Sequence, residues 1–175
     1  VPIGAILVDD LTGEVLAQAY NSVEDDMDVT SHAEILCLRK AAQRRGTWRL
    51  NSTSLYVTIE PCPMCLSALS LARVSSIIYG EKNVRLGSCG SWLSMHNETH
   101  PFHTFERIQG GVLAKECGEI LVDFFKTRRS NSAHPNKKPS EKKKNIFSRP
   151  KCKQGFPGPR LQQLVRRIRD LGGKG

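Results

Sequence analysis

Short apolar runs near the start of the chain are typical of β-strands. Residues 3–8 form such a run, and residues 14–20 form a second one after the turn residues 9–13. Two short strands joined in this way predict an antiparallel hairpin, whose loop is somewhat longer than the tightest kind. The acidic stretch at 23–29 has no apolar periodicity, so it predicts a loop.

The next segment has apolar residues at helical spacing. These positions, three or four residues apart, are Ile35, Leu38 and Ala42. Ser31 precedes them as a candidate N-cap, with Glu34 three residues on as in a capping box, and Gly46 follows them. The pattern therefore predicts a helix between Ser31 and Gly46.

After this helix the pattern predicts strands that alternate with helices. A near-continuous apolar run at 55–59 predicts a strand that is covered on both faces. Pro61 and Pro63 then break this strand and start a helix that runs to Arg73. The elements predicted after it are a strand at 76–79, an irregular stretch at 81–106, a last strand at 108–113, and a helix at 115–129 whose inward residues are Cys117, Ile120, Leu121, Phe124 and Phe125.

The order of these elements predicts the fold class. Strands separated by helices pair in parallel through right-handed crossovers, whereas the initial hairpin adds an antiparallel edge. We therefore predict an α/β fold with a mixed five-stranded sheet and helices on both of its faces.

Charge divides the chain into two parts. The chain has 175 residues and a formal net charge of +9. Residues 1–129 carry 13 Lys and Arg against 15 Asp and Glu, whereas residues 130–175 carry 13 against 2. The basic part suits a polyanionic partner such as nucleic acid, and a solvated tail is an equal alternative. We predict a folded domain at 1–129 and a basic, mostly disordered tail at 130–175.

One segment of this tail, residues 160–171, has a helical apolar pattern. Its apolar residues on one helical face are Leu161, Leu164, Val165, Ile168 and Leu171. Arg166, Arg167 and Arg169 surround that face. A short helix here would dock on RNA, on a partner or on the body of the protein. About 12 residues barely sustain a helix alone in water, however, so we expect this one to fray.

Six cysteines are spread along the chain, and only Cys62 and Cys65 are close in sequence. This spacing does not fit the disulfide framework of a small secreted domain and favours metal ligation in a reducing compartment. No apolar run approaches the ~20 residues that span a bilayer, so we expect no membrane partner. We expect a cytoplasmic protein, or one of the plastid stroma if a transit peptide precedes Val1.

Two short motifs carry residue types that bind metals. His32 opens the first predicted helix, and Cys62 and Cys65 lie three residues apart on one face at the start of the next. Thiolates are favoured at a helix N-terminus by its free N–H groups and by the positive end of the helix dipole. Three such ligands suit Zn²⁺ and leave a fourth position for water, as catalytic sites do. We predict one zinc ion at His32, Cys62 and Cys65.

Glu34 lies two residues after His32, within reach of that water without being a ligand. Zinc lowers the pKa of its water to about 7, and a carboxylate can take the proton and pass it on. His-x-Glu combined with Pro-Cys-x-x-Cys is the signature of the zinc deaminases. The alternative is a structural zinc clamp in which Glu34 only caps the helix. A redox role for the cysteines would leave His32 and Glu34 unexplained.

The sequence also resembles the bacterial and plastid tRNA-specific adenosine deaminases (TadA-type) across about residues 1–129. The matching stretches are residues 1–5, 20–21, 32–35, 55–62 and 123–129. The resemblance implies the three-layer cytidine deaminase-like fold, a homodimer, and conversion of adenosine to inosine at the wobble position of a tRNA anticodon. It also implies that Asn21 contacts the target nucleoside and that Arg128 and Arg129 lie near the RNA. Cations that stabilise a helix C-terminus are the alternative for the two arginines.

Three features depart from the family pattern. No helix precedes the first strand, the tail beyond Ser130 has no counterpart, and Asn83 stands where bacterial members often carry an acidic residue that faces the nucleic acid. Loss of that charge would relax a preference for RNA. Two other functions stay open. One is a deaminase of the same fold acting on a free base or nucleoside such as guanine or cytosine, and the other is a non-catalytic RNA-binding partner subunit.

Overall fold

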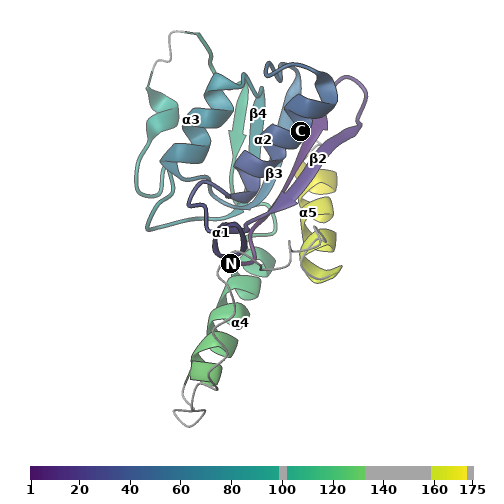
Figure 1. Ribbon diagram of the computed structural model, residues 1–175. Coiled ribbons are helices and arrows are strands. Elements are labelled where there is room, and N and C mark those ends of the chain that lie inside the picture. The colour runs from purple at the N-terminus through teal and green to yellow at the C-terminus, as the bar shows by residue number, and fades with distance from the viewer. Residues whose placement is uncertain (99–101, 133–158, 173–175) are drawn as a thin grey trace.

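Five strands form one mixed sheet in the computed structural model, which describes residues 1–98, 102–132 and 159–172 (Figure 1). In chain order the strands are β1 (Gly4–Asp9), β2 (Val15–Tyr20), β3 (Thr53–Ile59), β4 (Ser76–Glu81) and β5 (Arg107–Gln109). The order across the sheet is β2-β1-β3-β4-β5. β1 is antiparallel to both of its neighbours, whereas β3, β4 and β5 are parallel. The predicted mixed five-stranded sheet is therefore confirmed.

Helices cover both faces of this sheet (Figure 1). α2 (Ala33–Arg45) and α3 (Pro63–Leu71) lie on one face, and α4 (Ala114–Ser132) and α5 (Pro159–Gly172) lie on the other. The other helical elements are α1 (Val23–Asp26), which buries no residue, and a 3₁₀ turn at Met95–Asn97. Alternate residues of a strand point to opposite faces. Ala5 and Leu7 of β1 accordingly pack in a first core with α2 and α3. Ile6 and Val8 pack in a second core with α4 and α5, which gives the predicted three layers.

The first core fixes α2 and α3 against the sheet. Ala41 of α2 and Leu69 of α3 are fully buried in it. α2 ends where the sequence predicts, because Gly46 adopts the left-handed φ of 68°. The N–H of Thr47 then donates back to a carbonyl in the last turn of the helix (3.1 Å). Apolar burial and a glycine cap thus set the position of α2.

The second core includes the C-terminal helix α5, which contacts β1, β3 and β4. Its buried residues in this core are Leu161, Leu164, Val165 and Ile168. Gly4 permits the close approach, because a Cβ there would stand 3.0 Å from the side chain of Val165. The expectation that this helix frays was wrong, since burial of one apolar face stabilises a helix that is marginal alone. Residues 130–132 of the predicted tail are the last residues of α4 (Ala114–Ser132), whereas residues 133–158 and 173–175 lie outside the described residues.

Two predictions around the start of α2 were also wrong. Part of the predicted loop at 23–29 is the short helix α1, which acidic residues in its first turn and a hydrogen bond from the Ser22 hydroxyl to Asp26 favour. His32, not Ser31, is the N-cap of α2. Ser31 is buried instead, and its carbonyl accepts the Ser22 N–H (3.0 Å). The predicted capping box is therefore absent.

The C-terminal part differs from the prediction in two places. β5 ends at Gln109 rather than at residue 113, because the chain turns at Gly111, where φ is 88°. Figure 1 shows the second half of α4 extending beyond the sheet. Phe125, which was predicted to point inward, is therefore 45% exposed.

Ile168→Ala should destabilise the protein, because α5 is part of its fold. Ile168 is fully buried, so truncation leaves a cavity and should lower the free energy of unfolding by about 2–5 kcal/mol. Leu171→Ala is the matched control on the same helix; Leu171 is 55% exposed, so the change should stay within about 0.5 kcal/mol. Urea denaturation followed by circular dichroism measures both. Equal, small effects would contradict docking of α5.

Candidate metal centre

Two helix N-termini meet beyond the end of β3, and they carry the three predicted metal ligands. His32 is the N-cap of α2 and Cys62 is the N-cap of α3, each in extended backbone just before its helix. Cys65 lies in the first turn of α3 behind Pro63, whose missing N–H costs nothing at this position. The centre is therefore at the carboxyl edge of the parallel strands, where α/β folds bind ligands.

The ligand atoms have the spacing that a zinc ion requires. His32 Nδ1 lies 3.6 Å from Cys62 Sγ and 3.4 Å from Cys65 Sγ. Bonds of about 2.0–2.1 Å from zinc to nitrogen and 2.3 Å to sulfur, at tetrahedral angles, place nitrogen and sulfur about 3.6 Å apart. The three residues therefore fit Zn²⁺. Among the residues that the structure describes, no other group of three His, Cys, Asp or Glu side chains is close enough to hold a metal.

The charges in this cluster favour a thiolate. The pKa of the Cys62 thiol is lowered to about 4, first by a hydrogen bond with Cys65 and further by one with His32. The interaction with Cys62, together with burial, raises the pKa of the Cys65 thiol. The pKa of His32 is also raised, chiefly by its hydrogen bond with Cys62. One sulfur thus ionises readily, and a bound divalent cation would favour the second thiolate.

Glu34 stands beside the ligands in the first turn of α2. Its side chain is buried, and the residue is only 4% exposed. Burial raises the pKa of its carboxyl to about 7, although the nearby His32 opposes the shift. A carboxyl with such a pKa can both accept and donate a proton near neutral pH. The N–H of the N-cap His32 donates to the carbonyl of Thr30 (2.7 Å), so Glu34 does not make the bond to it that a capping box requires.

Asn21 follows β2 directly and is tied to the segment that leads into α2. Its N–H donates to the carbonyl of Ile3 (2.9 Å) at the start of β1. The N–H of the next residue, Ser22, donates to the carbonyl of Ser31 (3.0 Å), which precedes His32. These bonds bring the half-buried Asn21 to the segment that carries a metal ligand.

Glu60 is a site residue that the sequence interpretation missed. It precedes Cys62 by two positions and is 1% exposed. Its carboxylate accepts hydrogen bonds from the N–H groups of Asn83 (3.0 Å), Cys89 (2.8 Å) and Ser91 (3.2 Å), and from the Ser91 hydroxyl. These bonds clamp the loop after β4 to the ligand-bearing segment. The sequence feature that could have indicated this role is the position of Glu60, a charged residue directly between an apolar strand and the Pro-Cys motif.

The same loop positions Asn83, one of the predicted nucleic-acid contacts. The Asn83 side-chain oxygen accepts the N–H of Leu86 (3.1 Å), and its carbonyl accepts the N–H of Gly87 (2.6 Å). Gly87 must lack a side chain, because a Cβ there would stand 2.4 Å from the Glu60 carboxylate. Asn83 is therefore held in a tight turn, and its backbone is bound by the Glu60 carboxylate that also fixes the rest of the loop.

Arg128 and Arg129, the other predicted contacts, are exposed on α4 and do not belong to the metal cluster. The Arg128 guanidinium lies 5.7 Å from the centre of the Phe124 ring, within cation–π range. Its charge also acts at the position of Val1. The structure thus places Arg128 near the first residue of the chain.

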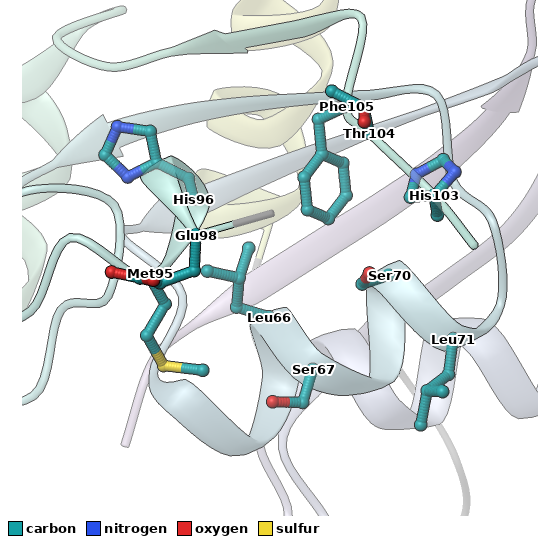
Figure 2. A pocket seen from close by; sticks show the side chains of 10 residues that line it. All are labelled: Leu66, Ser67, Ser70, Leu71, Met95, His96, Glu98, His103, Thr104 and Phe105. Atoms are coloured by element: carbon teal, nitrogen blue, oxygen red, sulfur yellow. The ribbon is translucent and has the colours of Figure 1, made fainter. Parts of the chain in front are cut away.

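A hollow of about 310 Å³ lies beside α3 but does not include the metal centre (Figure 2). Leu66, Ser67 and Leu71 of α3 form one wall. Figure 2 shows His96 and His103 on opposite sides of the hollow, with the Phe105 ring between them. None of its lining residues is a predicted ligand or the predicted proton carrier, so we assign the chemistry to the His32 cluster.

Comparisons with known proteins agree with this geometry. Residues 1–81 match the model of the cytidine and deoxycytidylate deaminase zinc-binding region, a span that includes all three ligands and Glu34. The chain is 40% identical over 141 residues to the tRNA-specific adenosine deaminase of Bacillus subtilis (strain 168), which covers 81% of this chain and 86% of that protein. The chain belongs to the tRNA-specific adenosine deaminase family.

The chain covers very different shares of the length of two other members of this deaminase family. It is 41% identical over 143 residues to the chloroplastic tRNA(adenine(34)) deaminase of Arabidopsis thaliana, covering 73% of this chain but only 11% of that protein. A solved structure from a study of A-to-I editing by tRNA:A34 deaminases at the wobble position has 38% identity and a TM-score of 0.64, covering 69% of this chain and 85% of that chain. The predicted cytidine deaminase-like fold is therefore confirmed.

Cys62→Ala should remove zinc from the deaminase. Two remaining protein ligands hold the ion too weakly to survive dialysis against a mild chelator. Cys117→Ala is the matched control, because Cys117 is equally a free cysteine but is buried in the second core. Elemental analysis should find about one zinc per chain in the wild type and in the control. A full zinc content in the Cys62 variant would contradict the ligand assignment.

Proposed function

We propose that this deaminase converts adenosine to inosine in a tRNA anticodon, at the wobble position. The observation that carries the proposal is the buried carboxyl of Glu34 beside three ligands that fit zinc. A purely structural zinc site does not require a buried carboxyl beside its ligands, whereas a catalytic site does, so the site is suited to catalysis. The activities named for the Bacillus and Arabidopsis relatives support adenosine in tRNA as the substrate.

In this mechanism the side chains of the chain hold zinc and move protons. His32, Cys62 and Cys65 would hold the zinc ion, which would supply an activated water for attack at C6 of adenine. Glu34 accepts the proton of that water and delivers it to N1 of the ring. It then carries the proton of the new hydroxyl to the amino group, which leaves as ammonia. Adenosine and one water thus become inosine and ammonia.

We further propose how the chain holds its RNA. The target adenosine must leave the base stack to reach a buried centre, and Asn21 contacts the flipped-out nucleoside from the end of β2. Arg128 and Arg129 contact the phosphate backbone from the exposed part of α4. Asn83, held by the loop that Glu60 clamps, contacts the RNA beside the pocket without adding negative charge.

Deamination of an anticodon stem-loop RNA tests this function. The zinc-loaded wild type should convert the wobble adenosine to inosine, and a chelator should abolish the reaction. Glu34→Ala should keep its fold and its zinc but lose about 10²–10⁴-fold in kcat, because no other group replaces the proton carrier. Mass spectrometry of the RNA measures the product, and Glu24→Ala on the exposed face of α1 is the matched control.

Each other outcome of this assay is informative. Turnover of free guanine or cytosine alone would replace tRNA by a free base as the substrate. RNA binding without inosine formation would indicate a non-catalytic partner subunit. Wild-type turnover by Glu34→Ala would refute the proton-transfer role of that residue.

We also propose a homodimer, formed through the apolar surface at the C-terminal end of α3. Leu71 is 63% exposed there, and it lines a shallow hollow of about 430 Å³ together with Trp48 and Phe102. The three side chains come from different segments and are all more than half exposed. Large apolar side chains that gather on a surface mark a contact site, and a second copy of the chain would bury them.

Leu71→Glu should convert this dimer to a monomer, because a carboxylate would be buried without a partner in the contact. Leu11→Glu is the matched control, since Leu11 is 82% exposed in the turn before β2. Sedimentation velocity at several concentrations distinguishes the two states. A monomeric wild type, or a dimeric Leu71 variant, would refute the proposed contact.

The compartment is also a proposal. Within the described ranges, no helix is long and apolar enough to cross a membrane. We propose the cytoplasm, with the plastid stroma as the alternative that the chloroplastic Arabidopsis relative supports. Both compartments suit the free thiols of Cys62 and Cys65, which zinc ligation requires.

A further inference from the structure

We propose that a basic groove along the free edge of β2 binds backbone phosphates of the RNA substrate, beyond the nucleotide that is deaminated. This inference rests on the proposed function. The groove has a volume of about 520 Å³ and is lined by residues 15–18 of β2 and by four cationic side chains: Lys40, Arg44, Arg166 and Arg169. We call it the β2-edge groove.

The groove lies where α2 packs on β2 on one face of the sheet and α5 packs on β1, β3 and β4 on the other face. α2 supplies Lys40, whose ammonium donates to the carbonyl of Gln18 (3.2 Å), and Arg44, whose guanidinium donates to the carbonyl of Val15 (2.8 Å). Hydrogen bonds to neutral carbonyls fix these side chains in place without cancelling their charge. The two cations are thus held along the edge strand.

α5 divides its arginines between two flanks. Arg160 pairs with Asp123 of α4 (3.2 Å), and Arg167 pairs with Glu116 of α4 (3.5 Å). Arg166 and Arg169 instead line the β2-edge groove. The helix that completes the second core therefore also presents two guanidinium groups toward the edge of the sheet.

Two carboxylates at the groove reduce its charge without removing it. Arg44 pairs with Glu14, and Arg169 pairs with its neighbour Asp170 (2.6 Å). Arg166 is exposed and forms no ion pair with any residue that the structure describes. Four cations against two anions leave an excess of two positive charges at one surface hollow. Such an excess, with planar guanidinium groups, suits phosphate oxygens.

The position of the groove fits a strand of RNA that leaves the metal centre. β2 ends beside Asn21, and His32 is the N-cap directly before α2. Lys40 and Arg44 lie eight and twelve residues further along α2, which is about 12 and 18 Å along the helix axis. A backbone that leaves the centre along β2 and α2 therefore reaches the groove. Contacts at this distance position the RNA and read no sequence.

The same geometry argues against an added β-strand at this edge. A peptide that extends the sheet would need the free carbonyls of β2 as acceptors. The carbonyls of Val15 and Gln18 already accept from Arg44 and Lys40. Charged side chains that cover an edge strand block such pairing. A polyanion, which needs the cations and not the carbonyls, is the occupant that this edge fits.

The test compares two double variants on the two flanks of α5. The groove variant carries Arg166→Ala and Arg169→Ala, and the matched control carries Arg160→Ala and Arg167→Ala. Both remove two positive charges from the same helix of the full chain. Binding of full-length tRNA is measured by fluorescence anisotropy from low to physiological salt, after thermal unfolding has confirmed that both variants keep the fold.

The groove variant should bind tRNA about ten-fold more weakly at low salt, with a slope of log K against log salt that is shallower by about 1–2. The control should stay within about two-fold of the wild type. Deamination of a short anticodon loop RNA that does not extend beyond the pocket should be equal in all three proteins. Equal losses of tRNA binding in both variants, or no loss in either, would overturn the groove.

Failure of the proposed function gives a different result. If the wild type neither deaminates nor binds tRNA, that function is wrong, and the groove is then tested with poly(U) as the probe. Weaker poly(U) binding by the groove variant than by the control would still support a phosphate-binding edge. Equal binding by both variants would refute it.

Discussion

The separations of 3.4 and 3.6 Å between His32 Nδ1 and the two cysteine sulfurs exist because α2 and α3 begin at the same edge of the sheet. His32 stands about thirty residues before the two cysteines in the chain, so no local geometry joins it to them. Burial of Ala41 and Leu69 in the first core holds the two helices where their N-termini meet. The three metal-ligating side chains and Glu34 beside them depend on this packing.

Two buried carboxylates divide the work around this centre. Glu34 sits in an environment where burial raises its pKa to about 7, which suits a group that accepts and releases protons. Glu60 is equally buried but accepts four hydrogen bonds from one loop, which suits a fixed anchor. The difference lies in the donors around each group and not in the side chain. Glu34 is therefore suited to proton transfer, whereas Glu60 holds the loop beside the centre in place.

The second face of the sheet links the basic C-terminal part of the chain to the deaminase domain. Ile6 and Val8 would be exposed on that face if Val165 and Ile168 did not cover them. The same docking places two arginines beside the edge strand, at the side where α2 presents its own cations. Part of the net charge of +9 is therefore concentrated in one surface hollow. The face of α5 that stabilises the fold is thus distinct from the flank that carries the proposed phosphate contacts.

Residue types and their spacing determined the reaction class by themselves. His-x-Glu and Pro-Cys-x-x-Cys are short windows, and each element whose apolar period is local, such as α2 or β3, was predicted within a few residues of its observed ends. Tertiary structure alone decided the N-cap at His32, the anchoring by Glu60 and the docking of α5. In each case the partner lies outside the local window: the N–H of Ser22 donates to the carbonyl of Ser31, a loop some thirty residues on binds Glu60, and α5 packs on β1. Burial and hydrogen bonds between remote segments decide such contacts, and no local period encodes them.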